Sequence, residues 1–190
     1  MRSPKPLEQT IYQIEVRLVG IEPKIWRRLQ VPGEFSLAQL HQVLQIAVGW
    51  ENSHLHRFTI GRRTFEQPAP AEYESECVAE DESQFRLREV LTHEGARAMY
   101  LYDFGDQWEH VMVVEMALQA EPGIRYPHCL EGERRCPPED CGGVPGYLDL
   151  LEAIAHPRRR HSRELLVWAG GDFNPEEFSV SRVNRTLRQV

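Results

Sequence analysis

The sequence lacks any long hydrophobic run. No stretch of eighteen apolar residues occurs in its 190 residues, which excludes a membrane-spanning helix. The basic first residues, MRSPKPLEQT, are not followed by an apolar stretch, so the pattern of a secretory signal is missing. We therefore expect a cytoplasmic protein without a membrane partner, in which thiols stay reduced.

Several common functional motifs are missing as well. The chain contains no G-x-S-x-G serine motif, no phosphate-binding P-loop and no dinucleotide-binding glycine pattern. Its formal net charge of −7 argues against a broadly basic surface for nucleic acid. No partner helix precedes the helix predicted at residues 36–50, so a helix-turn-helix is not supported.

What is present is the composition of an ordinary globular protein, with 41% apolar and 27% charged residues. The length predicts one domain, residues 1–190, with a core at 10–190. Residues 66–84 carry seven acids, no Lys or Arg and two prolines, and predict a mobile acidic loop. Residues 122–146 form a second irregular segment, rich in Cys, Pro and Gly.

The first half of the chain predicts a hairpin followed by a helix. Residues 11–19 alternate between apolar and polar side chains, as a half-buried strand does, and residues 25–31 predict its partner. Ser36 and Gln39 form a capping-box pattern at the start of an apolar helical stripe, and Gly49 is placed to end that helix. The stripe should dock on the sheet.

The second half predicts more strands and then helices. Residues 54–60 predict a strand with His54 and His56 side by side, and residues 97–102 and 108–116 predict a hairpin around Asp103-Phe104-Gly105-Asp106. Helical spacing resumes at 147–155, 162–169 and 179–187. The predicted fold class is α+β: a mixed or antiparallel sheet built from hairpins and packed against helices, with a helical C-terminal third.

Three of the four cysteines fall within thirteen residues, which suggests a zinc site. Cys129, Cys136 and Cys141 lack the tight C-x2–4-C pair of structural zinc loops, so a further ligand would have to come from a histidine. The candidates are His128 in the same segment, and His54, His56 and His110, which neighbouring strands could bring to one side of the sheet. The alternatives are reduced cysteines that fill a loop, and histidines that belong to the core. The fourth cysteine, Cys77, is predicted to be a free thiol.

A second candidate is a catalytic group of Asp103, Asp106, His110 and Glu139. Carboxylates beside an imidazole can act as a general base or hold a divalent cation. The alternative is that both aspartates only bond to their own turn backbone. Within the same two segments, we assign binding roles to five residues: Trp108, Asp140, Gly142, Gly143 and Tyr147.

A basic run is the only local feature that could contact nucleic acid. It contains Arg158, Arg159, Arg160 and Arg163. No aromatic residues alternate with these arginines and the total charge is negative, so a solvated loop between helices is the favoured interpretation.

The order of several short motifs resembles one family. These motifs are IWRR at 25–28, GW at 49–50, HLHRF at 54–58, YDFGDQWEH at 102–110, YPHC at 126–129, PPEDCGG at 137–143 and FNPEEF at 173–178. They resemble the plasmid Ri open-reading-frame-three-like proteins, described as passenger proteins of insertion elements and sometimes as TnpR-like. The resemblance spans residues 12–187. It implies a single α+β domain, found on chromosomes and on plasmids or transposable elements, and no proven enzyme activity.

Three hypotheses about function follow. The leading one is a cytosolic binding or accessory protein in which the DFGD hairpin, the PPEDCGG loop and the HLH strand converge on a polar pocket that could hold a metal ion, with zinc as the candidate cofactor. The second is a metal-dependent hydrolase or nuclease that uses the Asp/His/Glu group. The third treats the three segments as packing devices and the acidic loop as a surface for a protein partner.

Overall fold

One eight-stranded sheet forms the framework of the described part of the molecule. The computed structural model describes residues 10–68, 79–159 and 162–190. The strands are β1 (Thr10–Leu18), β2 (Trp26–Pro32), β3 (His56–Ile60), β4 (Arg63–Glu66), β5 (Glu80–Asp81), β6 (Arg97–Tyr102), β7 (Trp108–Gln119) and β8 (His128–Glu133). Their spatial order is β5-β4-β3-β6-β7-β1-β2-β8. The sheet is mixed, because β4 and β5 run parallel while the other neighbours are antiparallel.

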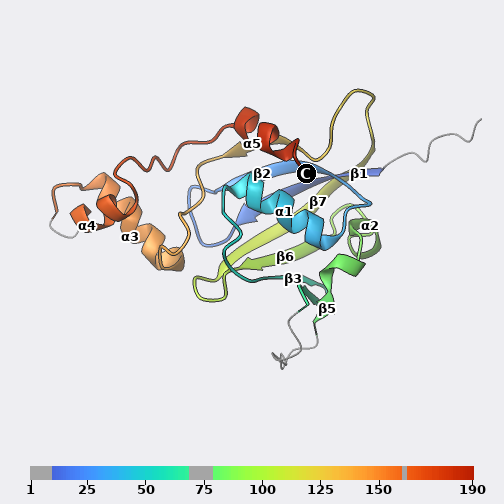
Figure 1. Ribbon diagram of the computed structural model, residues 1–190, viewed down its shortest axis with the longest axis horizontal. Helices are drawn as coiled ribbons and strands as arrows, with labels where there is room; N and C mark the ends of the chain where they lie inside the picture. The colour runs from blue at the N-terminus through green and yellow to red at the C-terminus, as the bar shows by residue number, and fades with distance from the viewer. Residues whose placement is uncertain (1–9, 69–78, 160–161) are drawn as a thin grey trace, which may run out of the picture.

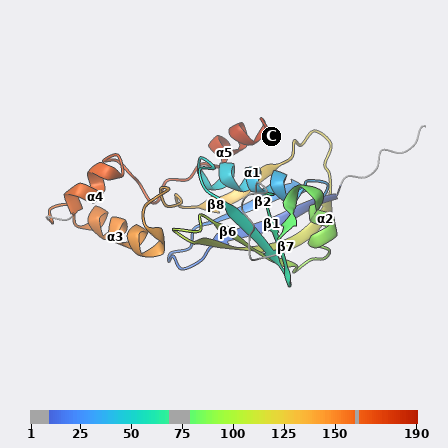
Figure 2. The same cartoon turned by 60° about the horizontal axis from the view of Figure 1, so that its bottom comes forward.

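The helices are short. They are α1 (Leu37–Val48), α2 (Leu87–Val90), α3 (Gly143–Ala155), α4 (Ser162–Trp168) and α5 (Val180–Leu187), with one 3-10 helix, η1 (Glu82–Gln84). Figures 1 and 2 show α1 and α5 over one face of the sheet, whereas α3 and α4 form an arm that projects from one end. None of the helices in the described ranges has the length and apolar character that crossing a bilayer requires.

Both predicted hairpins are confirmed. β1 pairs with β2 in antiparallel register, with Gln13 opposite Gln30. β6 pairs with β7 through the DFGD turn, with Tyr102 opposite Trp108. The alternating side chains of these strands place apolar residues on the face below α1. The opposite face is polar, and there Arg28 forms ion pairs with Glu15, Glu115 and Glu131.

The capping pattern of α1 is also confirmed. The Ser36 hydroxyl accepts a hydrogen bond from the Gln39 amide at 3.2 Å, and the Gln39 side chain accepts one from the Ser36 amide at 3.0 Å. Gly49 ends the helix with a φ of 86°, a conformation that favours glycine. The stripe Leu37, Leu40, Val43, Leu44 and Ala47 is buried in the same core cluster as the apolar side chains of the sheet.

The predicted fold class is wrong, because the C-terminal third contains a strand, β8, and two irregular stretches besides the helices α3, α4 and α5. Over residues 10–68, 79–159 and 162–190, the chain is mostly an eight-stranded mixed sheet with five short helices. The segment that was expected to be irregular contains β8, which pairs with the outer edge of β2. Residues 134–142 and 169–179 contain no helix or strand. Pairing to an exposed strand edge is a tertiary effect, so the local composition of residues 128–133 gives no sign of it.

Two further predictions change at their boundaries. β3 begins at His56, so His54 lies in the loop before it and the two imidazoles do not share a strand face. The described ends of the acidic loop form regular elements, β4, β5 and η1. The middle of that loop, residues 69–78 with Cys77, lies outside the described residues, as does Arg160 of the basic run.

Candidate functional site

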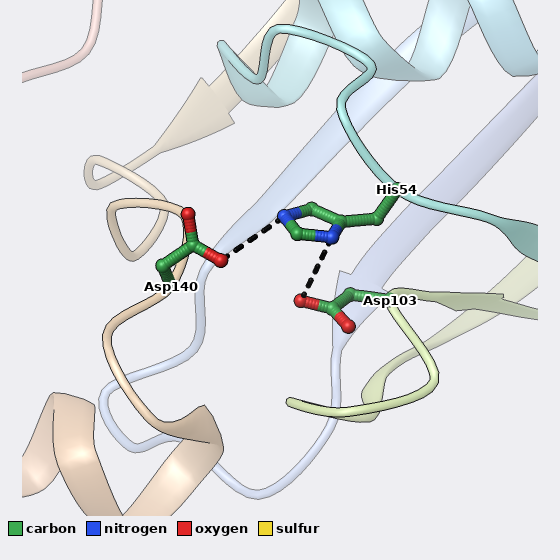
Figure 3. A group of neighbouring side chains, drawn as sticks. All are labelled: His54, Asp103 and Asp140. Atoms are coloured by element: carbon green, nitrogen blue, oxygen red, sulfur yellow. Dashed lines mark ion pairs between the residues drawn. The ribbon is translucent and has the colours of Figure 1, made fainter.

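Three segments that are distant in the sequence meet at one end of the sheet: the DFGD turn, the PPEDCGG loop and the loop before β3. The Asp106 carboxylate accepts a hydrogen bond from the Gly142 amide at 3.0 Å, which joins the turn to the loop. His54 reaches both, with Asp103 on one side of its ring and Asp140 on the other (Figure 3). We call His54, Asp103 and Asp140 the His/Asp/Asp cluster.

The turn holds Asp103 in a defined orientation. Asp103 has a φ of 60°, and one of its carboxylate oxygens, Oδ1, accepts hydrogen bonds from the amides of Gly105 at 2.8 Å and Asp106 at 3.3 Å. Short polar side chains such as Asp tolerate this backbone region because they bond locally. The second oxygen, Oδ2, is left facing the Nδ1 atom of His54 at 3.6 Å.

The PPEDCGG loop is fixed by close backbone contacts. A Cβ atom at Gly143 would lie 2.5 Å from the Asp106 carbonyl oxygen, so only glycine fits there. The Trp50 indole donates to the Pro137 carbonyl at 2.8 Å. The Glu139 carboxylate accepts hydrogen bonds from the Glu51 amide, at 2.9 Å, and from the Tyr102 hydroxyl. These bonds bring Asp140 to the cluster.

The loop that carries His54 is held by buried polar groups of α1 and β6. The Tyr102 hydroxyl accepts hydrogen bonds from the amides of Ser53 at 2.9 Å and His54 at 3.2 Å. The Asn52 amide donates to the Gln45 side chain at 3.0 Å, and the Asn52 side chain lies 2.6 Å from His41. Hydrogen bonds to core residues therefore fix the position of the loop that carries His54.

The cluster combines one imidazole with two carboxylates. Nε2 of His54 lies 3.2 Å from an Asp140 oxygen, yet it makes no hydrogen bond of acceptable geometry to the described residues. The exposed fractions of the three side chains are 26% for His54, 11% for Asp103 and 73% for Asp140. One ligand atom from each residue lies within 4.8 Å of the other two. Among the described residues this is the one group of at least three His, Cys, Asp or Glu with such spacing.

The structure places the four predicted catalytic residues in different environments. Asp103 belongs to the cluster, whereas the side chains of Asp106 and Glu139 bond to main chain and to Tyr102. His110 lies inside the core at 1% exposure, and burial lowers its pKa to about 4. It therefore stays neutral near pH 7 and is not accessible as an acid or base at the surface.

His56 is part of a different, buried arrangement. Its Nε2 atom lies 2.7 Å from the carboxylate of Glu82, and its ring stacks on His41 with centroids 3.5 Å apart. Burial, followed by repulsion from His56, lowers the pKa of His41 to about 4. Sequence reasoning missed both His41 and Glu82. His41 sits on the apolar stripe of α1, which was a usable signal, but nothing local marks Glu82 as buried.

In the described part of the chain, the three clustered cysteines do not form a group of three metal ligands, either with each other or with the histidines. None of them belongs to the His/Asp/Asp cluster. Burial raises the pKa of Cys129 to about 11 and of Cys141 to about 12, and it raises the pKa of Cys136 as well. Zinc binding would require these thiols to lose their protons, which burial opposes.

The remaining predicted residues lie in the core, in the loop beside the cluster or at the surface. Trp108 and Tyr147 are fully buried, and burial raises the pKa of the Tyr147 hydroxyl to about 12. Gly142 and Gly143 shape the loop beside the cluster. In the basic run, Arg159 pairs with Glu152, and Arg158 and Arg163 are exposed.

A cavity of about 710 Å³ adjoins the cluster. Asp140, Glu139 and Ser53 form one part of its wall, and the far wall comes from the start of α5 and the segment before it. Aromatic side chains and three arginines also line it: Trp50, Phe173, Phe178, Arg27, Arg135 and Arg182. Its volume falls in the range of small-molecule sites.

Comparisons with known proteins agree with this architecture. The chain is 36% identical over 180 residues to "Uncharacterized protein y4hQ" of Sinorhizobium fredii, a match that covers 94% of this chain and 91% of the relative. The crystal structure of a protein of unknown function, MM3350 from Methanosarcina mazei Go1, is similar with a TM-score of 0.82 and 32% identity, and covers 94% of this chain and 98% of that one. The family model described as "Plasmid pRiA4b ORF-3-like protein" matches residues 10–182. The chain therefore belongs to the plasmid pRiA4b ORF-3-like family.

Proposed function

We propose that the protein binds a divalent cation through the His/Asp/Asp cluster and uses it to hold a ligand in the adjoining cavity. The observation that carries the proposal is the spacing of one imidazole and two carboxylates, each with a ligand atom within 4.8 Å of the others. Small side-chain rotations suffice to close such a set on one ion. A mixed nitrogen and oxygen donor set suits zinc, manganese or iron, and thiolates are not needed.

The environment of the cluster supports this role. Asp103 is almost buried, and two backbone amides already fix its other oxygen. An ion can use an oxygen that is oriented in advance at little entropic cost. Asp140 is largely exposed, so three protein ligands leave coordination positions open toward solvent and the cavity.

The alternative occupant of the same space is a proton. A protonated His54 would form ion pairs with Asp103 and Asp140 and would need no metal. A cation would compete with protons for the same ligand atoms, so its affinity should fall as the pH falls. Competition of this kind distinguishes a metal site from a structural ion pair.

The test is a calorimetric titration of tag-free protein with Zn²⁺ and with Mn²⁺. Asp140→Asn removes one ligand charge at an exposed position, and its matched control is Asp149→Asn, an exposed acid on α3 outside the cluster. We expect one cation per chain for the wild type and the control, and an affinity at least about tenfold lower for Asp140→Asn. Equal affinities for the three proteins, or far less than one cation per chain in the wild type, would refute the proposal.

Open coordination positions favour a second candidate function, cation-dependent hydrolysis. Asp106 and Glu139 are held by hydrogen bonds, so the reaction would depend on the ion at the cluster to activate water rather than on those carboxylates. Turnover of a generic phosphodiester, bis(4-nitrophenyl) phosphate, should then require added cation and be lost in Asp140→Asn. Turnover that Asp140→Asn leaves unchanged would exclude this candidate.

A further inference from the structure

A second cavity lies away from the His/Asp/Asp cluster. Its volume is about 730 Å³, and it opens between the segment 123–128 and the last turn of α5. None of its lining residues belongs to the cluster or to the first cavity. This cavity is therefore a separate place in the fold from the proposed cation site.

Two guanidinium groups line this second cavity. They belong to Arg125 and Arg188, and none of the lining side chains is acidic. Among the described residues, no ion pair includes Arg125 or Arg188. In a chain with a formal net charge of −7, a pocket of this sign stands apart from its surroundings. The first cavity, by contrast, includes Glu51, Glu139, Asp140 and Glu177.

The rest of the wall is apolar and includes an aromatic ring. Ile124, Tyr126 and Leu187 line the cavity, and Ile124 is 45% exposed although it is a large hydrophobic residue. A ligand that covered Ile124 would gain hydrophobic burial, and one with a ring could pack on Tyr126. The lining therefore suits a ligand with both a charged end and an apolar body.

The wall is held together by specific contacts between α5 and the edge of the sheet. The Asn184 side chain accepts a hydrogen bond from the Cys129 amide at 2.7 Å and donates one to the Cys129 carbonyl at 2.8 Å. In this way Asn184 occupies the main-chain groups that β8 would otherwise present at an open edge. The same contact fixes Arg188, one turn further on, relative to the segment that carries Arg125.

We propose that this cavity binds a small organic anion, with its phosphate or carboxylate between Arg125 and Arg188 and its apolar body against Ile124, Tyr126 and Leu187. The two guanidinium groups must supply most of the attraction, because the carbonyl groups at the end of α5 carry partial negative charge. The apolar wall adds affinity and separates this ligand class from inorganic anions.

The experiment compares phenyl phosphate with inorganic phosphate by calorimetry on the full chain. The test variant is Arg125→Gln with Arg188→Gln, and the control is Arg185→Gln, on the same helix but outside the cavity. We expect phenyl phosphate to bind more tightly than inorganic phosphate, to lose at least about tenfold in affinity in the double variant and to keep its affinity in Arg185→Gln.

Three results would overturn the proposal. The first is no binding of phenyl phosphate by the wild type at millimolar concentration. The second is equal binding of both anions, which would mean that the apolar wall plays no part. The third is an equal loss in Arg185→Gln and in the double variant, which would indicate diffuse attraction to helix α5. The Zn²⁺ affinity of the double variant should match the wild type, so failure here leaves the proposed cation site untouched.

Discussion

At the scale of single residues, the site depends on backbone positions that only certain residues can occupy. Gly142 and Gly143 both have positive φ, at 91° and 67°. They differ in their surroundings: an added Cβ at Gly142 meets its nearest atom at 3.7 Å, whereas one at Gly143 meets the Asp106 carbonyl at 2.5 Å. Substituting each glycine in turn therefore distinguishes the cost of backbone strain from the cost of a clash with the DFGD turn.

We predict that Gly143→Ala destabilises the protein by about 2 kcal/mol more than Gly142→Ala does. Both variants put alanine into a left-handed conformation, at a cost of roughly 1 kcal/mol, but only Gly143→Ala also forces the loop away from Asp106. Urea unfolding of the two variants measures the difference. Equal losses of unfolding free energy would show that the loop and the turn are not in close contact.

Buried imidazoles give a second prediction, on pH dependence. His41 and His110 have pKa values lowered to about 4 by burial, against 6.5 in an unfolded chain. As the pH falls below about 6.5, these two imidazoles become protonated in the unfolded chain but stay neutral in the folded chain. The free energy of unfolding therefore falls until about pH 4. The loss should be roughly 3 kcal/mol for each imidazole.

The measurement is the free energy of unfolding between pH 7.5 and 4.5. His110→Leu should flatten the slope, because one of the two groups is gone, whatever its effect on stability at pH 7.5. His93→Gln, at an exposed position, should keep the wild-type slope. A slope unchanged in His110→Leu would mean that His110 has the same pKa in the folded and the unfolded protein.

At the scale of elements, the Arg27 side chain connects several parts of the fold, and no sequence pattern predicts this role. Its guanidinium is 2% exposed and donates to the carbonyls of Ala47 in α1, of Glu133 at the end of β8 and of Arg134 beyond it. It also lies over the Phe178 ring at 3.9 Å. A planar group with several donors can satisfy these acceptors together, and an ammonium group cannot.

We predict that Arg27→Lys costs at least about 3 kcal/mol of stability, since buried carbonyls lose their donors while the charge stays. Arg17→Lys, at an exposed position of β1, should cost almost nothing. Thermal unfolding of both variants checks this. A small loss in Arg27→Lys would show that water or main chain replaces the guanidinium.

The elements themselves differ in how far the sequence predicts them. α1 and the two hairpins follow from local rules, because capping, alternation and turn chemistry act over a few residues. β8 does not, since its pairing partner is the edge of β2, about a hundred residues earlier in the chain. The prediction of a helical C-terminal third was wrong for the same reason: residues 128–133 form a strand through a long-range contact, and the stretches 134–142 and 169–179 between the helices are irregular.

At the scale of the whole molecule, the meeting of three distant segments is the feature on which the functional proposal depends. Their convergence was predicted from the chemistry concentrated in them, and the structure has them in contact. The sequence predicted less well which side chains of these segments face the site. Asp103 and Asp140 face His54. The other candidates make hydrogen bonds within the fold or lie buried in it: Asp106, Glu139, His56 and His110. The direction of a side chain at a loop or a strand end depends on tertiary contacts, which the sequence does not show.

The most direct measurement is a crystal structure of the protein grown with Mn²⁺ or Zn²⁺, with anomalous scattering recorded at the metal edge. The account predicts one anomalous peak, within about 2.3 Å of donor atoms from His54, Asp103 and Asp140. A peak at Cys129, Cys136 or Cys141, or no peak at the cluster while the ion is present at saturating concentration, would contradict it.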